Sequence, residues 1–154
     1  MEYTTGSIGR TIVMRLHEDD HVYECIESVA QHEAISSGIV FIIGGVKNGG
    51  VVVGPTEQNE RPLNPLVERF EDAREIAGIG TLFKNKEGIP KLHMHASIGK
   101  GRAPLVGCPR KGLDCWLVSE IIIIEMTGIN AGRVPESSGL ELLKVFGTQA
   151  QKEF

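Results

Sequence analysis

The sequence has no long apolar run. Although 41% of its 154 residues are hydrophobic, no stretch approaches the roughly 20 apolar residues that cross a bilayer. The most apolar segment, residues 117–126, is interrupted by Ser119, Glu120 and Glu125. The first ten residues lack the basic and apolar regions of a secretory signal. We therefore expect a cytoplasmic protein that has no membrane partner.

Cysteine is also scarce, with only Cys25, Cys108 and Cys115 present. The number is odd, and a chain of this length can fold without disulfides. Cys25 lies on a helical pattern and Cys115 lies beside Trp116, so we expect both to be small core residues. Cys108 differs because its neighbours form a polar segment. We expect all three thiols to be reduced, and Cys108 to be the one available for chemistry.

Positive charge is not in excess, because 16 Lys and Arg residues face 20 Asp and Glu residues, a formal net charge of -4. This balance argues against nucleic-acid binding over the whole surface. Residues 84–111, however, contain seven basic residues and one acidic residue, a balance of +6 that leaves -10 for the rest. One interpretation is a solvated loop surface. The other is DNA contact through Lys100, Arg102, Arg110 and Lys111, although Phe83 is the one aromatic residue near this segment.

The remaining patterns predict strands and few helices. Alternation over residues 11–17 predicts a strand, and Asp19 or Asp20 can cap a helix whose apolar stripe runs to about Ala34. The Asn48-Gly49 pair between two apolar runs predicts a hairpin. We also expect a loop over 54–65, an ambiguous segment over 66–76 whose pattern suits a helix, strands over 76–83, 91–98 and 113–126, a loop over 99–112 and a short final helix over 137–146. The sequence therefore favours one α+β domain, mainly antiparallel β-sheet with a few short helices.

A His-x-His pair is the first chemical signal. On a strand, His93 and His95 point to the same face, whereas Met94 points to the other. Such a pair is typical of metal ligands but also of two solvated histidines. Cys108 is a third candidate ligand, and two imidazoles with a thiolate suit zinc and leave a fourth position open. Spacing alone leaves open whether Cys108 reaches the histidines or is a surface thiol.

Three segments together carry a family resemblance. The residues LHMHASIG at 92–99, VGCPRKG at 106–112 and SEIIII at 119–124 resemble the plant and prokaryote conserved (PPC) domain. In that family a His-x-His strand precedes a Gly-Gly-His triplet and a later strand with a glutamate. Here Cys108 stands where the family usually has the third histidine. Because cysteine is also a zinc ligand, the exchange keeps a metal-binding donor set and allows a changed affinity or metal preference.

The resemblance implies a single domain over residues 1–154, with a core of about 8–147, and a homotrimer. It implies that His93, His95 and Cys108 bind zinc or another divalent metal in a binding or assembly module. It also implies a fold-level likeness to acetolactate decarboxylases, which does not transfer function. Free-standing prokaryotic members are often called DNA-binding proteins. The segment 99–104, whose basic residues are Lys100 and Arg102, lacks the paired arginines of an AT-hook.

A metal-dependent lyase or hydrolase is an alternative function. It would need an acid or base beside the metal, and the candidates are Glu120 and Glu75, at positions that the resembling family tends to keep acidic. Glu120 shares strand parity with Ile122 and Ile124, which would make it unusual among apolar neighbours. It could then act as a proton shuttle. The other interpretation is a carboxylate that supports a ligand or pairs with Arg15.

Overall fold

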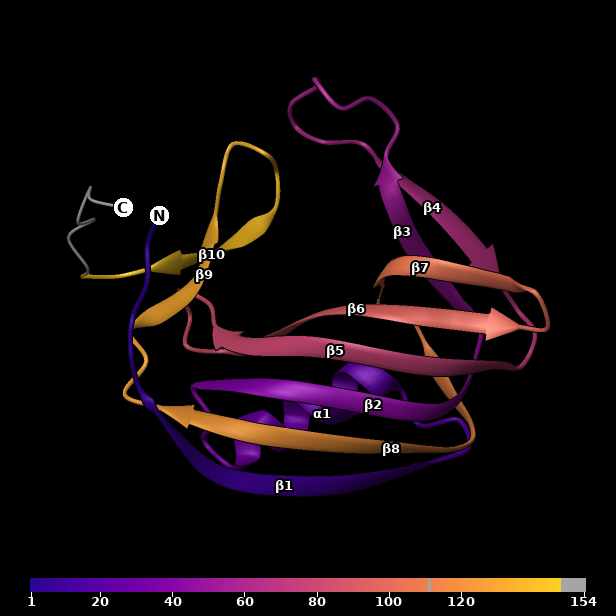
Figure 1. The fold of residues 1–154 in the computed structure, drawn as a ribbon, viewed down its shortest axis with the longest axis horizontal. Helices are drawn as coiled ribbons and strands as arrows, with labels where there is room; N and C mark the ends of the chain where they lie inside the picture. Colours follow the sequence, from indigo (N-terminus) through magenta and orange to yellow (C-terminus); the bar gives the residue numbers. More distant parts are fainter. Residues whose placement is uncertain (111, 148–154) are drawn as a thin grey trace.

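The structure is a computed structural model that describes residues 1–110 and 112–147. These residues form one helix and ten strands (Figure 1). The elements are β1 Ser7–His17, α1 Val22–His32, β2 Ser37–Lys47, β3 Gly49–Pro55, β4 Pro65–Phe70, β5 Arg74–Lys84, β6 Pro90–Lys100, β7 Ala103–Pro109, β8 Asp114–Thr127, β9 Ala131–Pro135 and β10 Glu141–Val145. No helix within the described ranges is long and apolar enough to span a membrane. Lys111, one of the candidate DNA contacts, lies outside the described residues.

Eight strands form one antiparallel sheet in the order β1-β8-β2-β5-β6-β7-β3-β4, and β9 pairs with β10 in a separate hairpin. Helix α1 lies along one face of the sheet (Figure 1). Its buried Ile26 belongs to the same core cluster as Ile42 of β2 and Ile123 of β8. Cys115 is in this core and Cys25 packs against it, as their surroundings predict. The expected α+β domain built on antiparallel sheet is confirmed.

Three segments that were expected to be helix or loop are strands instead. The segment with the helical pattern at 66–76 contains β4, which pairs with β3 at the sheet edge. The expected loop at 99–112 contains β7, and the expected final helix is β10. In each case the partner strand is either distant in the sequence or joined to the segment by a turn. Pairing with it satisfies the backbone N–H and C=O groups of the segment, and a local sequence pattern does not reveal such a partner.

The Asn48-Gly49 hairpin prediction is also wrong. Asn48 has a positive φ of 50°, as a tight turn requires. However, β2 pairs with β5 and β8, whereas β3 pairs with β4 and β7. The turn therefore carries the chain from one part of the sheet to another. The turn chemistry was correct, but it does not determine which strands pair.

The start of α1 differs from the predicted cap. The N-cap residue is His21, which makes no side-chain capping bond, while the Asp20 carboxylate accepts a bond from the His17 backbone N–H at 2.8 Å. His21 Nδ1 instead lies 2.7 Å from Asp114 Oδ1. This pair ties the helix start to the beginning of β8.

The pair also predicts a pH dependence of stability. The hydrogen bond from His21 to Asp114 raises the pKa of His21 above its usual 6.5, so the folded state favours the protonated imidazole. The stabilisation is complete below pH 6.5 and is lost as the pH rises through the raised pKa. We expect His21→Gln to lower the melting temperature at about pH 5.5 and to have little effect at about pH 9. His17→Gln is the control, and an equal loss at both pH values would contradict this assignment.

Candidate metal centre

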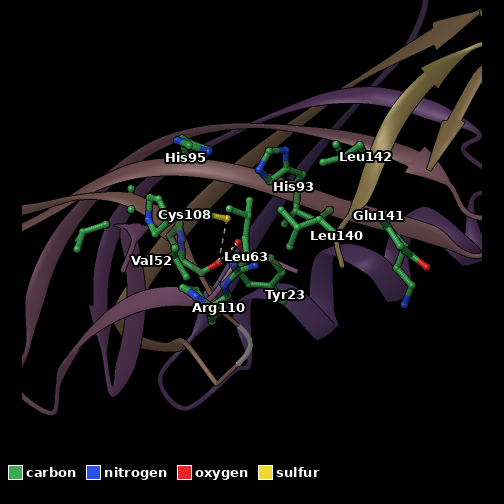
Figure 2. A pocket seen from close by; sticks show the side chains of 18 of the residues that line it. Tyr23, Val52, Leu63, His93, His95, Cys108, Arg110, Leu140, Glu141 and Leu142 are labelled. Carbon is green, nitrogen blue, oxygen red and sulfur yellow. Dashed lines mark hydrogen bonds between the residues drawn. The ribbon is translucent and has the colours of Figure 1, made fainter. Parts of the chain in front are cut away.

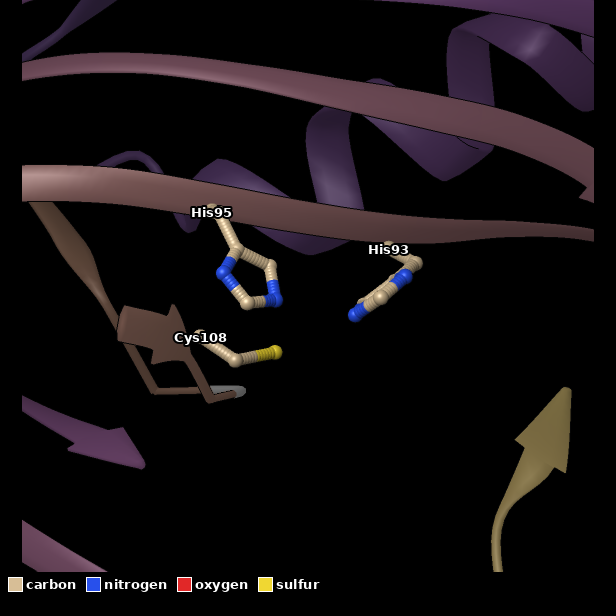
Figure 3. Close-up of side chains that lie close together, drawn as sticks. All are labelled: His93, His95 and Cys108. Atoms are coloured by element: carbon tan, nitrogen blue, oxygen red, sulfur yellow. The ribbon is translucent and has the colours of Figure 1, made fainter. Parts of the chain in front are cut away.

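Strand β6 presents the two histidines. Its buried residues alternate with exposed ones, so Leu92, Met94 and Ala96 enter the core while His93 and His95 face away from it. The predicted strand parity is therefore confirmed. The two imidazole rings have centroids 5.2 Å apart and are nearly perpendicular (Figure 3). Both rings lie on the sheet face opposite α1.

Strand β7 brings Cys108 to the histidines. Cys108 pairs with Val52 of β3, and the preceding Gly107 permits this approach, because a Cβ there would lie 2.1 Å from the Val52 carbonyl oxygen. The Tyr23 hydroxyl of α1 donates to the Pro109 carbonyl at 2.7 Å. The Cys108 thiol donates weakly to the same carbonyl, at 3.7 Å. Backbone pairing and the tyrosine thus fix the position of the sulfur.

The possible ligand atoms of His93, His95 and Cys108 all lie within 4.8 Å of one another, and Figure 3 shows the three side chains converging. In a tetrahedral zinc site, bonds of about 2.0–2.3 Å place the ligand atoms about 3.3–3.8 Å apart. Small side-chain rotations would close this difference. Two imidazole nitrogens and one thiolate are also ligands that zinc prefers. The residues therefore fit a zinc ion in both arrangement and chemistry.

The surroundings set the protonation of two of these candidate ligands. Partial burial, with smaller effects from Arg133, His95 and Arg110, lowers the pKa of His93, so its imidazole is neutral at pH 7 and has a free lone pair. Burial also raises the pKa of the Cys108 thiol, and its residue is only 8% exposed. Without a cation the sulfur stays protonated. Metal binding would displace that proton.

A pocket of about 640 Å³ opens beside the three side chains. In Figure 2, Val52 borders it on one side, while Leu140, Glu141 and Leu142 border it on the other. Tyr23, Glu27 and Arg133 also line it. Sequence reasoning missed all of these residues as site residues. The one available signal was Arg133, a charged residue between apolar neighbours in a segment that turns out to be a strand.

The candidate acid or base residues lie elsewhere. Glu75 and Glu120 are exposed, and neither lines the pocket. Glu120 stands opposite Arg15 of β1 and Ile43 of β2. Glu120 therefore faces solvent and is not buried among apolar side chains.

Of the candidate DNA contacts, Lys100 and Arg102 lie close together, whereas Arg110 lies apart from them. Lys100 and Arg102 lie at the turn between β6 and β7, where Lys100 pairs with Asp72 at 3.3 Å. Arg110 is exposed and lines the pocket. Arg102 and Arg110 thus leave two exposed positive charges at opposite ends of β7.

The family comparison gives a match over most of the chain. Residues 3–127 match the Plants and Prokaryotes Conserved (PCC) domain, the family also written PPC. The chain belongs to this family. The matched region contains His93, His95 and Cys108, whereas Arg133 and Glu141 of the PPC pocket lie beyond it. No curated protein gives a significant match.

Solved structures show the same fold. A plant- and prokaryote-conserved protein of Pyrococcus horikoshii is 25% identical, with a TM-score of 0.81 over 96% of this chain and 100% of its own. A metal-containing protein of Archaeoglobus fulgidus is 19% identical, with a TM-score of 0.78 over 92% and 98%. A protein of Ralstonia eutropha named as a candidate DNA-binding protein is 20% identical, with a TM-score of 0.67 over 86% and 90%.

Proposed function

We propose that this PPC protein is a metal-binding module that holds zinc through His93, His95 and Cys108 and recognises a small ligand beside it. The observation that carries the proposal is that these three side chains, from two strands, bring their ligand atoms within 4.8 Å of one another. Isolated solvated histidines would not require a buried cysteine beside them. The metal-containing A. fulgidus relative supports the proposal.

Three protein ligands leave a coordination position for water or a ligand atom, and zinc supplies Lewis-acid polarisation of whatever occupies it. Cys108 also belongs to β7, which forms one wall of the pocket. The metal would therefore add a second connection between β6 and β7, next to the pocket and just beyond the end of their backbone pairing at Ala96 and Gly107. A thiolate ligand suits a reducing compartment, and we propose that the protein works in the cytoplasm.

Zinc content tests this proposal. Protein purified from medium without added metal is expected to contain about one zinc per chain, because a site of two imidazoles and a thiolate binds zinc in preference to magnesium or calcium. The measurement is elemental analysis after extensive dialysis. Zinc close to zero in the dialysed wild type would remove the proposal.

We also propose that the protein is a homotrimer. An exposed apolar row crosses the sheet face opposite α1, because register places Val13 beside Ile122, Ile122 beside Phe41, Phe41 beside Ile79, and Ile79 beside His95. Val13 is 76% and Ile79 54% exposed. Contiguous apolar side chains of this kind are typical of interaction surfaces. The row ends at the metal ligands, so assembly would enclose the metal centre.

DNA association is a second candidate function, supported by the R. eutropha relative named as a candidate DNA-binding protein and by exposed Arg102 and Arg110. A trimer would present these charges three times. Phosphate contacts release counterions, so affinity falls with salt by about 0.9 log units per contact for each tenfold increase in salt.

The corresponding prediction uses two double variants. We expect Arg102→Ala/Arg110→Ala to weaken binding to non-specific duplex DNA about tenfold and to flatten its salt dependence. Arg61→Ala/Arg69→Ala, which removes two arginines outside the segment, is the matched control. Fluorescence anisotropy over a salt series is the measurement. No binding by the wild type at about 50 mM salt would rule out this function.

The metal-dependent lyase or hydrolase gains less support. Glu75 and Glu120 do not line the pocket beside the candidate metal ligands, so an acid or base would have to come from other residues. Among the residues that the structure describes, Glu27 and Glu141 are the carboxylates that do line it. The fold-level likeness to acetolactate decarboxylases stays a prediction.

A further inference from the structure

Arg133 of β9 is a buried charge at the wall of the pocket. The residue is only 5% exposed. One guanidinium nitrogen donates to the Thr81 hydroxyl at 2.8 Å, and the guanidinium carbon lies 5.7 Å from the centre of the Phe83 ring. The Nε atom is buried and has no hydrogen-bond partner among the described residues. A buried donor without a partner costs free energy unless another group accepts a hydrogen bond from it.

The described residues give this guanidinium no direct counter-ion. Within the described part of the chain, Arg133 makes no ion pair, and its hydrogen-bond partner Thr81 is neutral. The charge of Glu141 influences the pKa of Arg133 electrostatically, without a hydrogen bond between the two side chains. Buried charges are normally paired or hydrogen-bonded on every side. The arrangement therefore makes Arg133 suited to binding an anion.

The charges around the pocket point the same way. Lys91, Arg110 and Arg133 line it against the acids Glu27 and Glu141. Lys91 and Glu27 largely offset each other, because their charged atoms lie 3.6 Å apart. A zinc ion on one thiolate and two neutral imidazoles would add a further positive charge. The pocket would therefore attract an anion and repel a cation.

The remaining walls are apolar. Val52, Val53 and Leu63 line one part, and Leu140 and Leu142 line another (Figure 2). A multiply charged ligand such as inorganic phosphate would leave these walls uncovered. A ligand with one anionic head and an apolar body would cover them and pair with the arginine. The volume of about 640 Å³ suits a small organic molecule.

We propose that the pocket binds a small organic acid whose carboxylate accepts hydrogen bonds from Arg133 and whose apolar body lies against Leu140 and Leu142. A guanidinium can bind a carboxylate with two parallel hydrogen bonds, and Nε is available for one of them. This inference rests on the proposed function for the role of the pocket, and it names the ligand class. Arg133 is the specificity-determining residue, and the metal is not required for the contact.

Hexanoate is a suitable probe, with hexanamide and hexylamine as neutral and cationic probes of similar size. We expect isothermal titration of the zinc-containing wild type to show hexanoate binding at least about tenfold more tightly than either of the others. Arg133→Gln is expected to remove this preference, and Arg133→Lys to restore part of it. The control Arg69→Gln, which alters an exposed arginine outside the pocket, is expected to bind hexanoate like the wild type.

The wild-type comparison needs no variant, so it decides even if Arg133→Gln does not fold. Equal binding of hexanoate and hexanamide, or no hexanoate binding, would overturn the inference. Zinc-depleted wild type is the second arm of the experiment. A preference for hexanoate that persists without zinc supports the role of Arg133. Loss of the preference would assign the carboxylate to the metal and overturn the role of Arg133. Zinc content measured on the same samples separates the two proposals. Zinc in the purified protein without hexanoate binding defeats this inference alone. Arg133-dependent hexanoate binding by wild type that contains no zinc as purified defeats the metal proposal alone.

Discussion

Replacing Cys108 with alanine is expected to weaken zinc binding by about a hundredfold or more, because even residues that only orient zinc ligands contribute about tenfold to a hundredfold. The variant retains two imidazoles on β6 but loses the candidate ligand from β7, so any remaining site would be built on β6 alone. Cys108 is buried, so the loss of its sulfur also leaves a small space that water can fill. Competition with a chromophoric chelator at pH 7 measures the affinity.

Two further variants separate ligation from other effects of this change. Cys108→His places at this position the residue that the resembling family usually has, and we expect it to retain zinc with a changed affinity. Cys25→Ala removes a thiol from α1, away from the pocket lining, and should bind zinc like the wild type. Wild-type affinity in Cys108→Ala would show that the sulfur is not a ligand.

Replacing Ile79 with aspartate is expected to convert the proposed trimer into monomers. Ile79 lies at the centre of the exposed row, between Phe41 and His95. Burying a carboxylate in an apolar interface costs several kcal/mol per chain, and the cost recurs in every subunit. Light scattering coupled to size-exclusion chromatography measures the mass. Because all three proposed ligands come from one chain, the monomer should still bind zinc.

The matched control for this variant is Leu66→Asp. Leu66 of β4 is 47% exposed and lies outside the row, so its replacement should leave the mass unchanged. A wild type that is monomeric at micromolar concentration would contradict the assembly proposal. So would an Ile79→Asp variant that remains trimeric.

The histidine pair illustrates what the sequence can predict. Strand parity depends only on neighbouring residues, so the alternation of His93, Met94 and His95 predicted both the strand and the common face of the imidazoles. The amphipathic pattern of α1 predicted its buried face in the same way. Such features require no knowledge of distant contacts.

The position of Cys108 illustrates what sequence patterns do not determine. It depends on β7 pairing with β3, more than 50 residues earlier in the chain, and the segment reads as a polar loop. Arg133 is a similar case, because its burial requires β9 to pack beside β5, where Thr81 accepts its hydrogen bond. The family resemblance supported Cys108 as the third candidate ligand where local patterns left it open. It did not supply the arginine.

The most direct test of the metal centre is X-ray absorption at the zinc edge of the wild-type protein as purified. The proposal predicts a first shell containing two nitrogen scatterers at about 2.0–2.1 Å and one sulfur at about 2.3 Å. Sulfur should disappear from this shell in Cys108→Ala. A wild-type shell of nitrogen and oxygen without sulfur, or a preparation without zinc, would contradict the site of His93, His95 and Cys108.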